Sequence, residues 1–107
     1  MPAAFYVIRA TVADPGKRRA FDEWYHREHL PDVIKALGAV RAWRFWSVSD
    51  PSLHQAMYQV VDQATLDCAI GGEVIKKLVG EFDRAWPEVT RTREILVLAE
   101  EFAAGMT

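Results

Sequence analysis

The sequence predicts one α+β domain in which strands and helices follow the order β-α-β-β-α-β. The chain has 107 residues, a length that suits a single hydrophobic core. Four short stretches rich in β-branched and aromatic residues are typical of strands. Two further stretches repeat apolar residues every three or four positions, which is typical of amphipathic helices. Because there is no repeat, linker or low-complexity segment, the predicted domain covers residues 1–107.

The first half supplies a strand, a helix and a second strand. "AFYVIRATV", residues 4–12, is the first predicted strand. Asp14 offers an N-cap oxygen to the following helix, and Pro15 suits its first turn. The apolar face of that helix carries Phe21, Trp24, Tyr25 and His29. We expect the helix to end near Leu30, because the next residue is a proline. "DVIKALG" then forms a turn or a broken helix, and "AVRAWRFWSVS", residues 39–49, forms the second strand.

The second half supplies two more strands around one helix. "HQAMYQVVD", residues 54–62, is the third predicted strand. Residues 64–86 follow a helical period, and Gly71 and Gly72 are expected to break or kink the front of this helix. Pro87 ends it, and "VTRTREILVLAEEF", residues 89–102, forms the last strand.

This order is that of the ferredoxin-like fold, in which two helices cover one face of a four-stranded antiparallel sheet. The second sheet face is then bare, and large apolar patches of this kind usually mark an interface or a ligand groove. Three pairs of apolar residues each place one member there: Trp43 or Trp46, Met57 or Tyr58, and Ile95 or Leu96. We therefore expect a homodimer in which two sheets pack face to face.

Composition and charge exclude several classes of function. The formal net charge of −2 gives no reason to expect a nucleic acid or an anionic membrane as partner. No segment approaches the roughly 18 apolar residues of a membrane span, and the first residues do not resemble a signal peptide. Cys68 is the single cysteine, which excludes an internal disulfide and a cysteine-rich metal site. These observations favour a cytoplasmic location.

One stretch carries a family resemblance: "FDEWYHREHLPDVIKALGAVRAWRF", residues 21–45. It resembles the EthD-like branch of the dimeric α/β-barrel proteins, in which an aromatic pair precedes an HxP motif and a glycine leads into the second strand. Here these are Trp24-Tyr25, His29-Leu30-Pro31 and Gly38. Relatives in the wider group include polyketide cyclases, dehydratases, lactone isomerases and cofactor-free monooxygenases. The resemblance implies a pocket between sheet and helices, with His29 and Tyr25 beside it.

His29 is the leading catalytic candidate, because histidine both accepts and donates protons near neutrality. A place in the last helical turn favours the imidazolium, whereas burial against Phe21 and Tyr25 favours the neutral ring. The alternative is a structural role, in which His29 hydrogen-bonds a free carbonyl at the helix end. Tyr25 either donates a hydrogen bond to a substrate oxygen or closes the core.

Five further residues are candidates for substrate binding. Arg41 and Arg44 lie on opposite faces of the second strand, and whichever faces a cavity can bind a carboxylate, enolate or phenolate oxygen. Trp43 and Trp46 divide in the same way between core and cavity wall. Asp32 either orients His29 or caps the next turn.

We predict no metal site and no organic cofactor. His26 lies among charged residues and His54 follows a turn, so both are expected to face water. Cys68 has no cationic neighbour to stabilise a thiolate, and is expected to be a small buried residue.

The sequence thus predicts a small cofactor-independent enzyme acting on an apolar cyclic carbonyl or phenolic compound by isomerisation, cyclisation or dehydration. Three alternatives stay open. The first is a non-catalytic dimer that binds a small apolar or aromatic molecule, or that has a filled interface and no pocket. The second is a cofactor-free monooxygenase. The third is a tautomerase that uses Pro2 as its base once Met1 has been removed.

Overall fold

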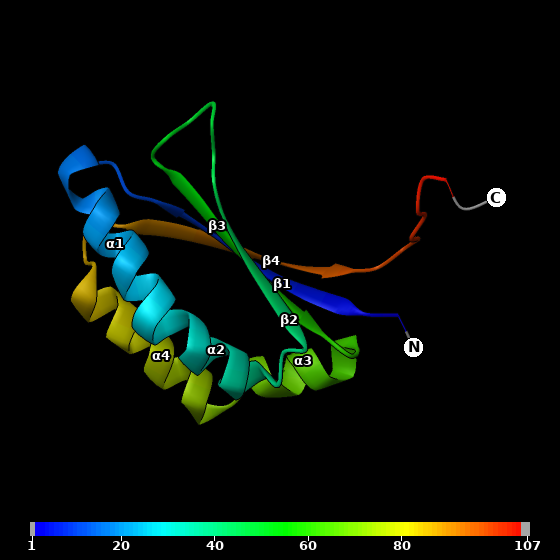
Figure 1. Ribbon diagram of the computed structural model, residues 1–107. Coiled ribbons are helices and arrows are strands. Elements are labelled where there is room, and N and C mark those ends of the chain that lie inside the picture. The colour runs from blue at the N-terminus through cyan, green and yellow to red at the C-terminus, as the bar shows by residue number, and fades with distance from the viewer. Residues whose placement is uncertain (1, 106–107) are drawn as a thin grey trace.

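A computed structural model describes residues 2–105 as one sheet with a helical layer on one face (Figure 1). The strands are β1 (Ala4–Thr11), β2 (Arg41–Trp46), β3 (Leu53–Val60) and β4 (Thr90–Val97). The helices are α1 (Arg18–Trp24), α2 (Leu30–Leu37), α3 (Gln63–Ile70) and α4 (Glu73–Ala85), together with a 3-10 turn, η1 (Pro15–Lys17), and a π-helical turn, η2 (Tyr25–His29). Neighbouring strands are antiparallel in the order β2-β3-β1-β4. The predicted α+β ferredoxin-like fold is confirmed.

The strand register separates a covered face from an open face of the sheet. Tyr6 of β1 lies opposite Tyr58 of β3, and both side chains are buried under the helices. Side chains alternate along a strand, so their sequence neighbours point away from the helices. The apolar residues of this open face include Phe5, Val7, Trp43, Phe45, Leu53, Met57 and Leu96. Phe45 and Leu96 are 45% and 42% exposed, so the face is apolar and partly open to solvent.

The first helical segment does not end near Leu30, as the proline had suggested. It continues without interruption through η2 into α2 and ends at Gly38, whose left-handed φ of 66° a glycine adopts without strain. In η2 the Leu30 amide donates to the Tyr25 carbonyl, five residues back. This wider turn re-spaces the carbonyls ahead of Pro31, whose ring would otherwise clash with the preceding turn. The π turn thus lets the helix pass the proline.

The second helical segment breaks where the glycine pair predicted. α3 ends at Ile70, α4 begins at Glu73, and the Gly72 amide donates to the Ala69 carbonyl at 3.1 Å. Cys68 of α3 is exposed, so its predicted burial was wrong. The reason is that α3 buries only Leu66 against the sheet.

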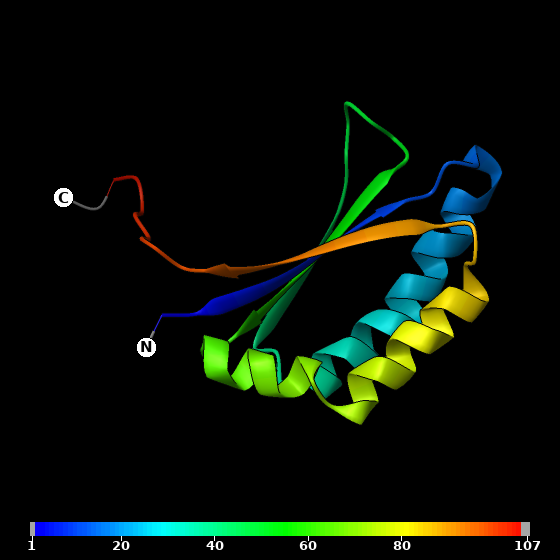
Figure 2. The ribbon, with the colours of Figure 1, turned by 180° about the vertical axis from the view of Figure 1, so that it is seen from behind.

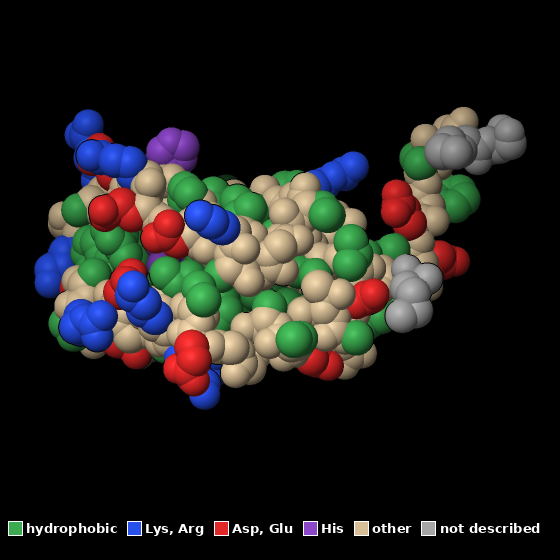
Figure 3. All heavy atoms as spheres, turned by 90° about the horizontal axis from the view of Figure 1, so that it is seen from below, with side chains coloured by type: hydrophobic (Ala, Val, Ile, Leu, Met, Phe, Trp, Pro, Cys, Tyr) green, Lys and Arg blue, Asp and Glu red, His purple; other side chains and the backbone are tan. Residues whose placement is uncertain are grey.

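The helical layer leaves the β4 edge of the sheet less covered than the β2 edge. Viewed from the back, β4 runs in front of the other strands (Figure 2), and most of its residues are exposed, whereas most residues of β2 are partly buried. On the outer side of the helices, basic and acidic side chains are interspersed (Figure 3). Within residues 2–105, the helices are all too short or too polar to cross a membrane.

Candidate active site

The His29 ring is held by aromatic contacts alone. It is 7% exposed, stacks on Trp24 with ring centroids 4.9 Å apart, and meets Tyr25 and Phe82 edge-on at 5.0 and 5.4 Å. Among residues 2–105 no side chain or carbonyl forms a hydrogen bond with it. The helix continues past His29, so the helix-end carbonyls that the structural role assumed lie farther along the chain, near Gly38. Packing therefore orients the ring and leaves its nitrogens available.

Burial sets the charge state of His29. Burial, followed by the nearby positive charge of Arg91, lowers the pKa of His29 to about 4. The opposing dipole effect expected at a helix end does not arise, because α2 continues the helix. His29 is consequently a neutral imidazole at neutral pH, able to accept a hydrogen bond or a proton.

Two tyrosine hydroxyls lie beside His29. The Tyr25 and Tyr58 oxygens are 2.9 Å apart and both residues are buried. One hydroxyl donates to the other, so the acceptor's own proton remains available for a further hydrogen bond. Burial raises the pKa of Tyr25 to about 12 and raises that of Tyr58 well above its usual value, so both stay protonated. The pair therefore offers one O–H donor beside a neutral base.

These groups line an inner cavity that lies beside a groove between α4 and β4. His29, Tyr25, Tyr58 and Arg91 line the cavity, whose volume is about 20 Å³, enough for about one water molecule. Two larger hollows of about 320 and 530 Å³ lie along the groove. Tyr6 and Val79 line all three spaces, so the cavity and both hollows share walls. His29 lines the inner cavity and neither of the two hollows.

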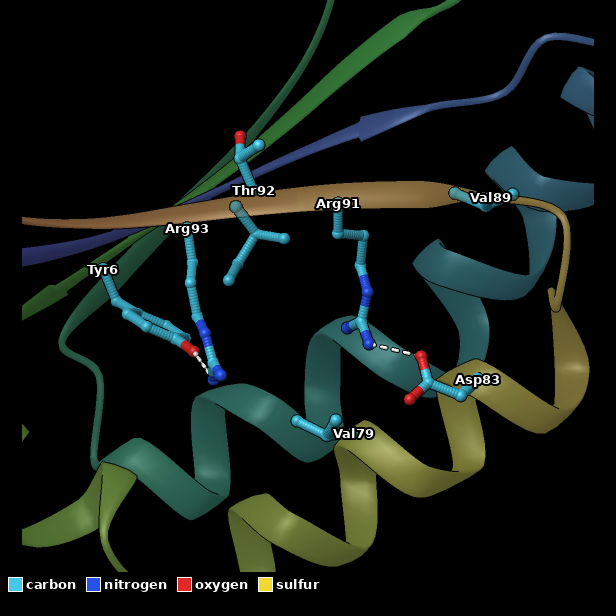
Figure 4. A pocket seen from close by; sticks show the side chains of 8 residues that line it. Tyr6, Val79, Asp83, Val89, Arg91, Thr92 and Arg93 are labelled. Atoms are coloured by element: carbon cyan, nitrogen blue, oxygen red, sulfur yellow. Dashed lines mark hydrogen bonds and ion pairs between the residues drawn. The ribbon is translucent and has the colours of Figure 1, made fainter.

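Two arginines of β4 project into this groove, and the sequence reasoning missed both. Arg91 and Arg93 extend from the strand toward α4 (Figure 4). Arg91 pairs with Asp83 at 2.6 Å and lies 3.8 Å above the Phe82 ring, whereas Arg93 donates to the Tyr6 hydroxyl at 3.3 Å. Their spacing of two residues indicated a common face. No sequence signal indicated that this face borders the groove.

A second polar cluster lies on the β2 side of Tyr25. Arg44 donates to the His54 Nε2 atom at 3.2 Å and pairs with Asp22, which also accepts from the Trp46 indole at 2.7 Å. Burial alone would raise the pKa of Asp22, but the hydrogen bonds from Trp46 and Arg44 outweigh it and lower that pKa. His54 is fully buried, so its predicted exposure was wrong. Its place in β3 directs it under the helices, opposite Ala10.

The predicted binding residues are not gathered around His29. Arg41 and Trp43 project to the open face of the sheet, away from the cavity. Arg44 and Trp46 belong to the cluster around Asp22 and do not line the inner cavity. Two other sequence candidates lie apart from it as well. Asp32 is exposed in the first turn of α2, and Pro2 is exposed ahead of β1, while Met1 lies outside the described residues.

The described residues offer no site for a metal ion of the usual kind. Between residues 2 and 105, no three His, Cys, Asp or Glu side chains lie close enough together to hold one. His26, as expected, is exposed on the helix surface. The donors around the inner cavity are an imidazole, two hydroxyls and a guanidinium.

Solved structures share this fold over nearly the whole chain. An EthD family protein from Bacillus halodurans has a TM-score of 0.67 and 20% identity, covering 92% of this chain and 99% of its own. HapK from Hahella chejuensis has a TM-score of 0.66 and 18% identity, covering 95% and 99%. SnoaB, a cofactor-independent oxygenase from Streptomyces nogalater, has a TM-score of 0.67 and 14% identity, covering 99% and 100%.

No protein-family model and no curated protein matches the sequence. The resemblance to the EthD-like branch is thus confirmed as a likeness of fold. At these identities the likeness is one of fold and does not extend to chemistry.

Proposed function

We propose that this protein is a cofactor-independent enzyme that starts its reaction by removing a proton from an apolar cyclic carbonyl or phenolic compound. One observation carries the proposal: His29 is a neutral, buried imidazole without a hydrogen bond among residues 2–105, in a cavity that shares walls with a larger groove. A general base has to be unprotonated and within reach of its substrate. His29 meets the first condition at neutral pH and, in a ligand-filled groove, the second.

Groups beside His29 suit the charge that proton removal creates. An enolate or phenolate oxygen in the cavity would accept a hydrogen bond from the Tyr25–Tyr58 pair and lie near the Arg91 guanidinium. Without a bound anion, the positive charge of Arg91 disfavours the protonated form of His29. A substrate anion between the two cations would remove this penalty, so base and oxyanion are stabilised together. Because the low pKa of His29 makes it a weak base, the substrate must have a comparatively acidic proton.

The enolate would have several possible fates. Protonation at a second carbon gives isomerisation, loss of a neighbouring hydroxyl gives dehydration, and attack on an internal carbonyl gives cyclisation. In the last two reactions the His29 imidazolium would return its proton to the oxygen that leaves or that is formed. The same residues would serve each outcome, and the shape of the groove would select among them.

The second candidate function is a cofactor-free monooxygenase, which the fold likeness to the oxygenase SnoaB favours. The first step is again proton removal by His29, and O₂ is the co-reactant. Conversion of an activated methylene to a carbonyl takes one oxygen atom from O₂ and releases the other as water. All four electrons come from the substrate, so the step balances without a cofactor.

Proton exchange tests the shared first step. With 2-tetralone as probe in D₂O without O₂, we expect the protein to accelerate deuterium uptake at the methylene between ring and carbonyl, measured by NMR. His29→Gln should reduce this rate about 100-fold or more, the usual contribution of a general base. His26→Gln, which alters an exposed histidine of the same turn, is the matched control. Exchange that is unchanged in His29→Gln would contradict the proposal.

Admitting O₂ separates the two candidate functions. Consumption of O₂ that depends on His29 supports the oxygenase, whereas exchange without O₂ consumption supports isomerisation, cyclisation or dehydration. Saturable binding of the probe with neither activity supports the non-catalytic binding protein.

We also propose that the open face of the sheet packs against a second copy of the chain. Its apolar residues include Trp43 and Phe5, whose rings lie 6.3 Å apart, and burying them offsets the cost of association. Trp43→Asp should convert a dimer to a monomer in sedimentation equilibrium. Val74→Asp, which places the same charge on the exposed helical side, should leave the dimer intact. A monomer in the unmodified protein would contradict this proposal.

A further inference from the structure

The two arginines of β4 differ in how their charges are balanced. Arg91 has a carboxylate partner, Asp83, at 2.6 Å. Arg93 has only the neutral Tyr6 hydroxyl, and no carboxylate among residues 2–105 pairs with it. Tyr6 is 4% exposed, so one hydrogen bond to a buried residue holds the exposed Arg93 side chain over the groove. Arg93 therefore presents a positioned and uncompensated positive charge to the groove.

The walls around Arg93 are apolar with a small excess of positive charge. The hollow of about 530 Å³ is lined by Ile70, Ile75, Lys76, Val79, Glu94 and Ile95, besides Tyr6 and Arg93. Glu94 lies opposite Val7, so its side chain points to the open face of the sheet, whereas Lys76 of this hollow lies 3.6 Å from Glu73. In the neighbouring hollow Arg91 and Arg93 face the single carboxylate of Asp83. Both hollows thus favour an anion attached to an apolar body.

We propose that the natural ligand is an organic acid, with an apolar ring system along Val79 and Ile75 and a carboxylate on Arg93. This inference rests on the proposed function and specifies its substrate class. A guanidinium offers two parallel N–H donors that match a carboxylate, and a hydrogen bond between charged groups is stronger than one between neutral groups. The acid anchors the ligand in the outer groove, while His29 acts on a different part of the molecule.

Binding of a matched pair of probes tests the proposal. 2-Naphthoate and 2-naphthamide share one ring system and nearly one shape, and they differ in charge. By isothermal titration near neutral pH, we expect naphthoate to bind about ten-fold more tightly than naphthamide. Arg93→Gln should weaken naphthoate to about the affinity of naphthamide, and should leave the Kd of naphthamide within about two-fold. Arg84→Gln, an exposed arginine of α4 outside both hollows, should leave both affinities unchanged.

Three results would overturn the proposal. Equal affinities for the two probes, an equal loss in Arg84→Gln, or a naphthoate preference that survives Arg93→Gln would each exclude an anchor at Arg93. The failure of the proposed function is a separate result, because proton exchange in 2-tetralone requires no acid group. Loss of acid preference with intact, His29-dependent exchange would remove this inference alone, whereas absence of binding by both probes would overturn it together with the groove as a binding site.

Discussion

Two buried histidines on opposite sides of Tyr25 have the same charge state but very different surroundings. Burial is the main cause that lowers the pKa of each to about 4. His54 is tied by Arg44 into a cluster with Asp22 and Trp46. His29 has aromatic contacts and no hydrogen bond within residues 2–105, and it lines the inner cavity. Burial alone thus does not distinguish the two rings, and neither does an unpartnered nitrogen, because the Nδ1 atom of His54 also has none among residues 2–105; the inner cavity, which only His29 of the two lines, does distinguish them.

The largest expected difference between the two regions is in stability. Arg44→Ala removes the partner of both His54 and Asp22, and should lower the free energy of unfolding by about 2–3 kcal/mol. His29→Gln breaks no hydrogen bond and loses only aromatic contacts, so it should cost at most about 1 kcal/mol. Urea denaturation of the two variants measures both values. A cost for His29→Gln as large as that for Arg44→Ala would indicate a structural role for His29.

The pH dependence of stability should be shared equally by both histidines. The pKa of each is about 4 in the folded protein, against an ordinary value of 6.5, so between these values the unfolded state binds more protons. The free energy of unfolding should therefore fall as the pH falls through this window, by up to about 1.4 kcal/mol per pH unit for each histidine. Above pH 6.5 both histidines are neutral in the folded and unfolded states and impose no penalty on folding. By pH 4 most of their destabilising effect on the free energy of unfolding has developed.

Variants separate the contributions of the two histidines. His29→Gln should remove about half of the slope in denaturation curves recorded across this pH window. A slope that does not respond to His29→Gln would mean that His29 is not buried in its neutral form.

The smallest expected effect concerns the charge partners of the two arginines in the groove. Asp83→Asn removes the internal carboxylate that now holds Arg91, so this guanidinium becomes available to a ligand anion. We expect naphthoate to bind a few-fold more tightly in this variant, and naphthamide to bind as before. Isothermal titration measures the change. Weaker naphthoate binding in Asp83→Asn would instead show that Asp83 is needed to position Arg91.

The sequence predicted the fold well because strand order and helix period are local properties. The face shared by Phe21, Tyr25 and His29 is buried, as its period indicated. The end of the first helix was placed too early, because proline rules do not anticipate a π turn that accommodates Pro31. That error also assigned His29 a helix-end dipole that does not exist.

The site was less predictable because it depends on pairing between distant strands. Arg44 and Trp46 face the helices, but Asp22 and His54 occupy their polar groups, and neither partnership has a local sequence signal. Arg91 reaches the cavity only because β4 pairs with β1, more than eighty positions away in the sequence.

The most direct test of the central claim is an NMR titration of the His29 ring. We expect a pKa of about 4 and therefore a neutral ring at neutral pH. In Arg91→Gln this pKa should rise modestly, because the variant removes a neighbouring positive charge. Retention of the neutral form down to pH 5, with titration below it, would support His29 as an available base. A pKa at or above 6.5 would contradict the account, because the imidazole would then be solvated or held by a carboxylate.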